Sequence, residues 1–185
     1  MQDLLGDKVE EIRVALRALG SRMERGDVSE LVVWVIPGAL GCAHRPLRHH
    51  PEYGGSRRDL PSEATRAVVR WVDRIIGAGF RSVICLMHPK EVAHYSALDL
   101  GATDLIAYYR MRGLQVCHKP WDDPAHRSLR QRASYKSELR RVRTESLECF
   151  DQLPKPVLLH CSAGIDRSSP VAAFIWNQLS KEATV

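Results

Sequence analysis

Short runs of consecutive apolar residues, separated by longer amphipathic segments, constrain the fold of this chain more than any other feature. Four runs suit buried strands, and they read LVVWVIPG, FRSVICLM, LQVCHKPW and KPVLLHC. Strands without a polar face are buried on both sides, which is typical of parallel sheets covered by helices. The sequence therefore predicts an α/β fold with a central, mainly parallel sheet flanked by helices.

The segments between these runs have the spacing of amphipathic helices. Apolar residues recur at steps of three and four over 3–24. Similar patterns predict helices from Ser62 to Gly77 or Gly79 and over 90–97, 102–112, 128–150 and 168–181. Residues 38–58 have no period and much Gly, Pro and charge, which favours a long surface loop.

The 185 residues are interpreted as a single domain, 1–185, with the helix within residues 1–24 packed on it. That helix has an apolar stripe wide enough to cover the sheet. Its spacing is also close to a heptad, so a coiled-coil dimer is the alternative, and the oligomeric state stays open.

Charge and composition limit the function classes. A net charge of +5 favours anionic partners, whereas dispersed basic residues and 6% aromatics disfavour a nucleic-acid surface. We expect no membrane span, because no apolar run is long enough, and no signal peptide. The five cysteines are odd in number and lack a framework spacing, which predicts free thiols and a cytoplasmic location.

The stretch VLLHCSAGIDRSS is the strongest candidate for chemistry. Its strand ends at Cys161 and a helix follows from Ser168, and ligands of open α/β sheets bind at such carboxyl ends. Backbone N–H groups in the intervening loop can form a nest that binds a phosphoryl group at the helix N-terminus. The expected phosphate-binding residues are Ser162, Ala163, Gly164, Ile165, Asp166 and Arg167.

Each side chain in this loop suits one task. The thiolate of Cys161 is a nucleophile, and a helix N-terminus with nearby cations favours that form of a cysteine. Arg167 offers two parallel donors to phosphate oxygens. His160 is expected to order the loop, and Ser168 to donate its hydroxyl to the sulfur.

HCSAGIDRS resembles the His-Cys-x5-Arg-Ser/Thr signature of cysteine-dependent protein tyrosine phosphatases, in particular the small dual-specificity type. The order of elements from Leu31 to Lys181 is also similar, including the YYRMRGLQVCHKPW approach to an acidic loop. The resemblance implies a dual-specificity-phosphatase-like fold, here with an extra N-terminal helix and a shortened C-terminus. It further implies hydrolysis of phosphate monoesters, on phosphotyrosine and phosphoserine or phosphothreonine of proteins, through a cysteinyl-phosphate intermediate.

That chemistry needs a general acid, because the leaving oxygen must gain a proton as its bond to phosphorus breaks. In HKPWDDPAH, Asp123 before Pro124 best matches the acid of the family, and Asp122 is the second candidate. Both aspartates would also suit a simple turn or helix cap.

One residue departs from the usual loop. Asp166, directly before Arg167, lowers the positive charge of the loop. A bacterial branch with phosphoinositide activity has a similar aspartate, but a lysine precedes it there, whereas Ile165 does here. This difference disfavours a lipid substrate.

Weaker clusters lie elsewhere. Arg45, Arg48, His49 and His50 form a basic loop that either contacts substrate anions or is merely solvated. Zinc-ligand types occur without paired spacing, so we expect no metal and no cofactor. Cysteines within the predicted strands, Cys85 and Cys117, are interpreted as buried core residues, with a resolving role toward oxidised Cys161 as the alternative.

Four other functions stay open at this point. A phosphoinositide phosphatase or an RNA 5′-phosphatase would use the same mechanism. A rhodanese-like sulfurtransferase also places a cysteine in a strand-to-helix loop. A non-catalytic module would bind phosphate without turnover.

Overall fold

The computed structural model describes residues 4–55, 60–123 and 134–182. Its centre is a five-stranded sheet with the order β1-β2-β5-β3-β4, in which β1 is antiparallel to β2 and the other neighbours are parallel. The predicted α/β class with a mainly parallel sheet is therefore confirmed. The strands are β1 (Val33–Ile36), β2 (Leu40–Ala43), β3 (Ser82–Cys85), β4 (Gln115–His118) and β5 (Val157–His160).

Strand β2 is a correction to the sequence analysis, which assigned residues 38–58 to a surface loop. Its four residues, LGCA, are too few to show a period, yet all of them are buried because β2 lies between β1 and β5. Gly41 is required there. A Cβ atom at this position would lie 2.4 Å from Cγ1 of Val32 and 2.8 Å from Cζ of Phe80.

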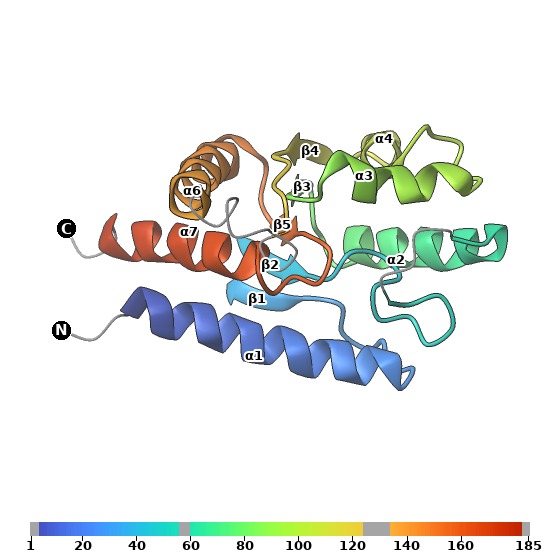
Figure 1. Ribbon diagram of the computed structural model, residues 1–185, viewed down its shortest axis with the longest axis horizontal. Helices are drawn as coiled ribbons and strands as arrows, with labels where there is room; N and C mark the ends of the chain where they lie inside the picture. The colour runs from blue at the N-terminus through green and yellow to red at the C-terminus, as the bar shows by residue number, and fades with distance from the viewer. Residues whose placement is uncertain (1–3, 56–59, 124–133, 183–185) are drawn as a thin grey trace.

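Helices cover both faces of the sheet, with α6 and α7 on the left-hand side of Figure 1 and α2 and α4 on the right-hand side. Each predicted helix is present, although the expected beginning at residue 128 lies outside the described residues. No helix in the described ranges combines the length and apolarity that a membrane crossing requires. The helices are α1 (Leu4–Glu24), α2 (Thr65–Gly77), α3 (Pro89–Val92), α4 (Leu105–Met111), α6 (Tyr135–Gln152) and α7 (Ser168–Glu182), with single turns η1 (Ser62–Ala64) and η2 (Ala93–Ala97).

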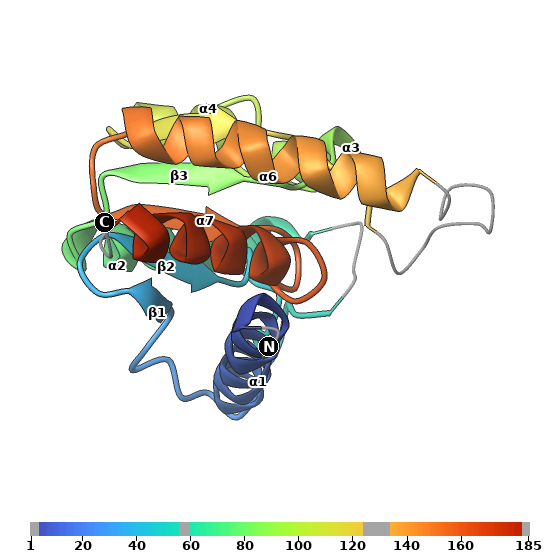
Figure 2. The ribbon, with the colours of Figure 1, turned by 90° about the vertical axis from the view of Figure 1, so that its left-hand side faces the viewer.

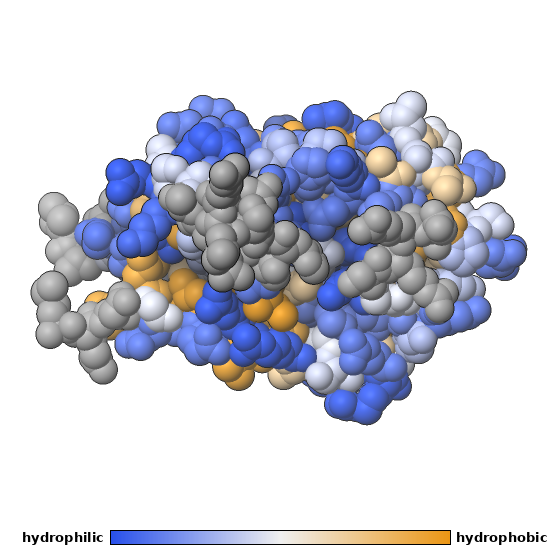
Figure 3. All heavy atoms as spheres, in the orientation of Figure 1, coloured by the Kyte–Doolittle hydropathy of each residue, from blue (hydrophilic) through white to orange (hydrophobic). Residues whose placement is uncertain are grey.

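Helix α1 packs against α7 and β1, and Figure 2 shows it crossing below α7. Five of its residues are buried in the common core, namely Ile12, Leu16, Leu19, Gly20 and Met23. The ammonium of Lys8 lies 5.0 Å from the centre of the Trp176 ring on α7. The buried residues of the apolar stripe of α1 are thus covered by its own chain. The space-filling view shows apolar surface that stays exposed between hydrophilic residues on the left-hand part of this face (Figure 3).

A disulfide joins Cys117 on β4 to Cys149 on α6, with their Cα atoms 6.3 Å apart. The prediction of free thiols is wrong for these two residues, because residues 32 positions apart carry no local spacing signal. Cys117 is also half-buried and paired with Cys149 rather than a buried free residue, whereas Cys85 is buried as expected. Cys42, Cys85 and Cys161 are free. The cysteine content consequently no longer supports a reducing compartment, since persistent disulfides are rare there.

Candidate active site

The predicted loop, residues 161–167, follows the carboxyl end of β5 and leads into α7, as expected. Strand β5 lies between β2 and β3, so that Ala43 and Cys85 both stand beside His160 in the register. Cys161 is only 2% exposed. The candidate nucleophile therefore lies at the centre of the sheet edge rather than at its margin.

Gly164 gives the loop its tight turn. Its φ is +73°, in the left-handed region that favours glycine, and its N–H donates to Sγ of Cys161 over 3.1 Å. A Cβ atom here would lie 3.1 Å from the carbonyl oxygen of Ala43 and 3.2 Å from Cδ1 of Leu16. Sterics and backbone conformation together require glycine next to the sulfur.

His160 is fully buried and fixed in one tautomer. Its Nδ1–H donates to the carbonyl oxygen of Cys161 over 3.0 Å, because a carbonyl can only accept, and its Nε2 accepts from the hydroxyl of Tyr109 over 3.2 Å. Burial lowers the pKa of His160 to about 4. A neutral ring with both nitrogens occupied suits the predicted role in ordering the loop.

His44, which the sequence analysis did not select as a loop residue, connects the loop to α1. Its ring nitrogens lie 2.8 Å from the carbonyl oxygen of Ala163 and 2.9 Å from that of Leu16. Burial lowers the pKa of His44 to about 4, so the ring is neutral at pH 7 and donates to one of these carbonyls at a time.

Arg167 is 1% exposed, and its guanidinium is held from two sides. Its Nη1 and Nη2 donate to the carboxylate of Glu91 over 2.5 and 2.7 Å, and Nη1 also donates to the carbonyl oxygen of Trp121 over 3.0 Å. Burial acts to lower the pKa of Arg167, but Glu91 and Cys161 outweigh it and raise the pKa above its ordinary value. The cation is thus permanent and rigidly oriented.

Two donors of the loop are buried without a hydrogen-bond partner among the described residues. They are Nε of Arg167 and Oγ of Ser168. The expected hydrogen bond from the Ser168 hydroxyl to the sulfur of Cys161 is therefore not formed; the sulfur accepts from the N–H of Gly164 instead. Leaving such donors without a hydrogen bond costs free energy, unless a ligand accepts hydrogen bonds from them.

Glu91 was missed by the sequence analysis, and a local signal for it existed. In His88-Pro89-Lys90-Glu91, the side chain of His88 accepts from the Lys90 N–H and the Glu91 carboxylate accepts from the His88 N–H, which together form a capping box. Burial acts to raise the pKa of Glu91, but the hydrogen bonds and charge of Arg167 outweigh it and hold the pKa below its usual range. The capping pattern locates this carboxylate, but its partner 76 residues away does not follow from it.

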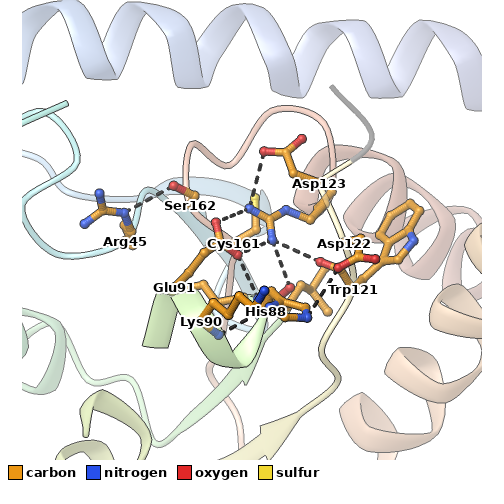
Figure 4. A network of polar contacts seen from close by, with 12 residues as sticks. Arg45, His88, Lys90, Glu91, Trp121, Asp122, Asp123, Cys161 and Ser162 are labelled. Carbon is orange, nitrogen blue, oxygen red and sulfur yellow. Dashed lines mark hydrogen bonds and ion pairs between the residues drawn. The ribbon is translucent and has the colours of Figure 1, made fainter. Parts of the chain in front are cut away.

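The two acid candidates lie on different sides of the guanidinium. Oδ2 of Asp123 is 3.6 Å from Nη2 of Arg167, whereas Oδ1 of Asp122 is 3.4 Å from Nε2 of His88. Figure 4 shows Asp123 on the side of Cys161 and Asp122 beside His88. This arrangement places Asp123 near the loop and Asp122 at its periphery.

The two arginines of the expected basic loop, Arg45 and Arg48, differ in burial and in role. Arg45 is 4% exposed and structural. It donates to Oγ of Ser162 over 3.2 Å (Figure 4). It also donates to the hydroxyl of Tyr95 over 2.9 Å. It is neither a solvated side chain nor free to bind an anion. Arg48 is half-buried, and burial lowers its pKa although Asp123 and Cys161 act to raise it. Arg48 is therefore electrostatically coupled to the site.

The remaining loop residues line the turn. Oγ of Ser169 donates to the carbonyl oxygen of Gly164 over 2.9 Å, while Ile165 and Asp166 are half-buried.

Two free cysteines lie on the strands next to β5. Burial raises the pKa of Cys85 to about 12 and that of Cys42 still further, so these thiols stay protonated.

No group of three or more His, Cys, Asp or Glu side chains in the described part of the chain is arranged to hold a metal ion. In comparisons with known proteins, no family model, no curated protein and no solved structure matches this chain.

Proposed function

We propose that this chain is a cysteine-dependent phosphatase of the dual-specificity type, acting on phosphate monoesters of proteins. The observation that carries the proposal is a pair of buried donors at the loop of Cys161 that have no hydrogen-bond partner in the described part of the chain. Nε of Arg167 and Oγ of Ser168 would both be satisfied by an oxyanion. The loop N–H groups and the start of α7 favour the same ligand.

The mechanism follows from the positions of three side chains. The thiolate of Cys161 attacks phosphorus, the S–P bond forms and the P–O bond breaks, while Asp123 gives its proton to the leaving oxygen. Water then attacks phosphorus and passes a proton to the Asp123 carboxylate. The S–P bond breaks, which returns the thiolate and releases phosphate. Arg167 binds two phosphoryl oxygens throughout.

Asp123 favours this reaction over sulfur transfer. Its carboxylate lies 3.6 Å from Arg167, where a phosphoryl group would bring its leaving oxygen within reach. A sulfurtransferase releases sulfite from thiosulfate and needs no proton donor at a leaving oxygen. The joint presence of nucleophile, cation and acid likewise favours turnover over simple phosphate binding.

A substrate panel tests the proposal. Purified wild type and Cys161→Ser are assayed with phosphotyrosine and phosphothreonine peptides, phosphoinositides, RNA with a 5′-triphosphate, and thiosulfate with cyanide. We expect the wild type to hydrolyse the phosphopeptides and Cys161→Ser to lose turnover while it still binds inorganic phosphate, because only the nucleophile is gone.

Cys85→Ala is the matched control, since it alters a buried free cysteine on a neighbouring strand and leaves the loop sequence intact. It should retain activity. Near-normal turnover by Cys161→Ser would contradict the mechanism, and preference for a lipid, RNA or thiosulfate would correct the substrate class.

A further inference from the structure

His88 contacts both Glu91, which binds the guanidinium of Arg167, and Asp122, and its ring has a fixed orientation. It is the N-cap of α3, where its Nδ1 accepts from the Lys90 N–H over 3.2 Å and its own N–H donates to Oε2 of Glu91 over 2.7 Å. Because Nδ1 accepts, a neutral ring carries its proton on Nε2. That atom faces Oδ1 of Asp122 at 3.4 Å (Figure 4).

The segment 121–123 is restrained on both sides of Asp122. The carbonyl oxygen of Trp121 accepts from Arg167, and the indole N–H of Trp121 donates to Glu138 over 3.1 Å. The indole ring stacks on the ring of Tyr135, with the ring centres 5.6 Å apart. Asp123 lies near the guanidinium of Arg167. Since the backbone of adjacent residues moves together, a restraint on Asp122 also limits where the carboxylate of Asp123 points.

We infer that His88 is a positioning residue that holds Asp122 and thereby orients Asp123 toward the leaving oxygen. This inference rests on the proposed function. The contact behind it is the 3.4 Å approach of Nε2 of His88 to Oδ1 of Asp122.

The expected size of the effect is small and specific. The side chains of His88 and Asp122 are 37% and 55% exposed, and exposed pairs of this kind are weak. We expect about a fivefold loss of turnover without the contact, well below the roughly 10²–10⁴-fold loss when a general acid is removed.

Two substitutions separate the capping role of His88 from its reach. His88→Asn keeps a strong N-cap whose side-chain oxygen can accept from the Lys90 N–H, but it is too short to reach Asp122. His88→Gln is a poorer cap but carries an amide N–H about as far as Nε2. If the contact orients Asp123, the His88→Asn variant has a kcat for alkyl phosphates that is about fivefold lower than wild type. Its kcat for activated aryl phosphates and its affinity for inorganic phosphate stay unchanged. The His88→Gln variant regains part of the lost kcat.

The partner residue completes a double-mutant cycle. Asp122→Ala should reproduce the loss seen with His88→Asn, and the double variant should lose no more than either single variant. Additive losses, an equal loss with both ester types, or unchanged kinetics in His88→Asn would overturn the inference.

Hydrogen exchange measured by mass spectrometry gives a readout that does not depend on turnover. In His88→Asn, amides of residues 119–123 should exchange faster while those of α3 stay unchanged, because the cap is retained. Unchanged exchange in 119–123 overturns the inference even if the enzyme is active. Absence of wild-type activity on every phosphate ester would instead contradict the proposed function, and exchange would still decide whether His88 holds this segment.

Discussion

Reduction of the Cys117–Cys149 disulfide should destabilise the protein by an amount that follows from the loop it closes. The two cysteines are 32 residues apart, and the chain-entropy relation gives about 3–4 kcal/mol at 25 °C for a loop of that length. For a chain of this size each kcal/mol corresponds to about 2–4 °C in the melting temperature. We therefore expect reduction to lower the melting temperature by roughly 7–15 °C.

The measurement is thermal unfolding with and without dithiothreitol, which reduces the disulfide by exchange and leaves as its own cyclic disulfide. Thiol titration in denaturant should find three free thiols before reduction and five after it. A Cys117→Ala/Cys149→Ala double variant is the control, because dithiothreitol should leave its melting temperature unchanged. Five thiols before reduction, or equal melting temperatures of oxidised and reduced wild type, would refute the reasoning.

Four further predictions concern the site. Arg167→Lys should lose both phosphate binding and turnover in titration and kinetic assays, because one ammonium cannot replace the planar fork held by Glu91; normal binding would contradict this. Asp123→Asn should slow esters with poor leaving groups by roughly 10²–10⁴-fold and activated esters much less, and the same pattern in Asp122→Asn instead would reverse the assignment. Gly164→Ala should destabilise the fold by about 1–2 kcal/mol in denaturant unfolding through its positive φ, with further loss from contact with Ala43, and wild-type stability would contradict this. Glu91→Gln should be less stable than wild type above pH 4.5, and the difference should shrink as the pH falls through the lowered pKa of Glu91, whereas a pH-independent difference would exclude that ion pair as its source.

The loop could be predicted from the sequence because everything that forms it is contiguous. A strand, a glycine and a helix start within a dozen residues determine where Cys161 and Arg167 lie. Local pattern alone did not separate the adjacent carboxylates Asp122 and Asp123, and only the resemblance ranked Asp123 first, since one residue of difference decides which side of the guanidinium each faces.

The parts that were missed depend on distant partners. Glu91 meets Arg167 across 76 residues, and Cys117 meets Cys149 across 32, so no local pattern records either contact. The prediction for the segment that forms strand β2 was wrong for another reason. Four residues that include Gly41 look like a loop until their neighbours in the sheet are known.

The position of β5 has a consequence for the order in which the chain can fold. Among the described residues it is the last strand in sequence, but it pairs with β2 on one side and β3 on the other. Until residues 157–160 have left the ribosome, the facing edges of β2 and β3 have no strand between them, and exposed edges of this kind invite association with other chains. The segment that ends at Cys161 therefore completes the sheet late in synthesis, and the rest of the loop through Arg167 follows directly. Nascent chains stopped before Val157 should accordingly need the protection of chaperones.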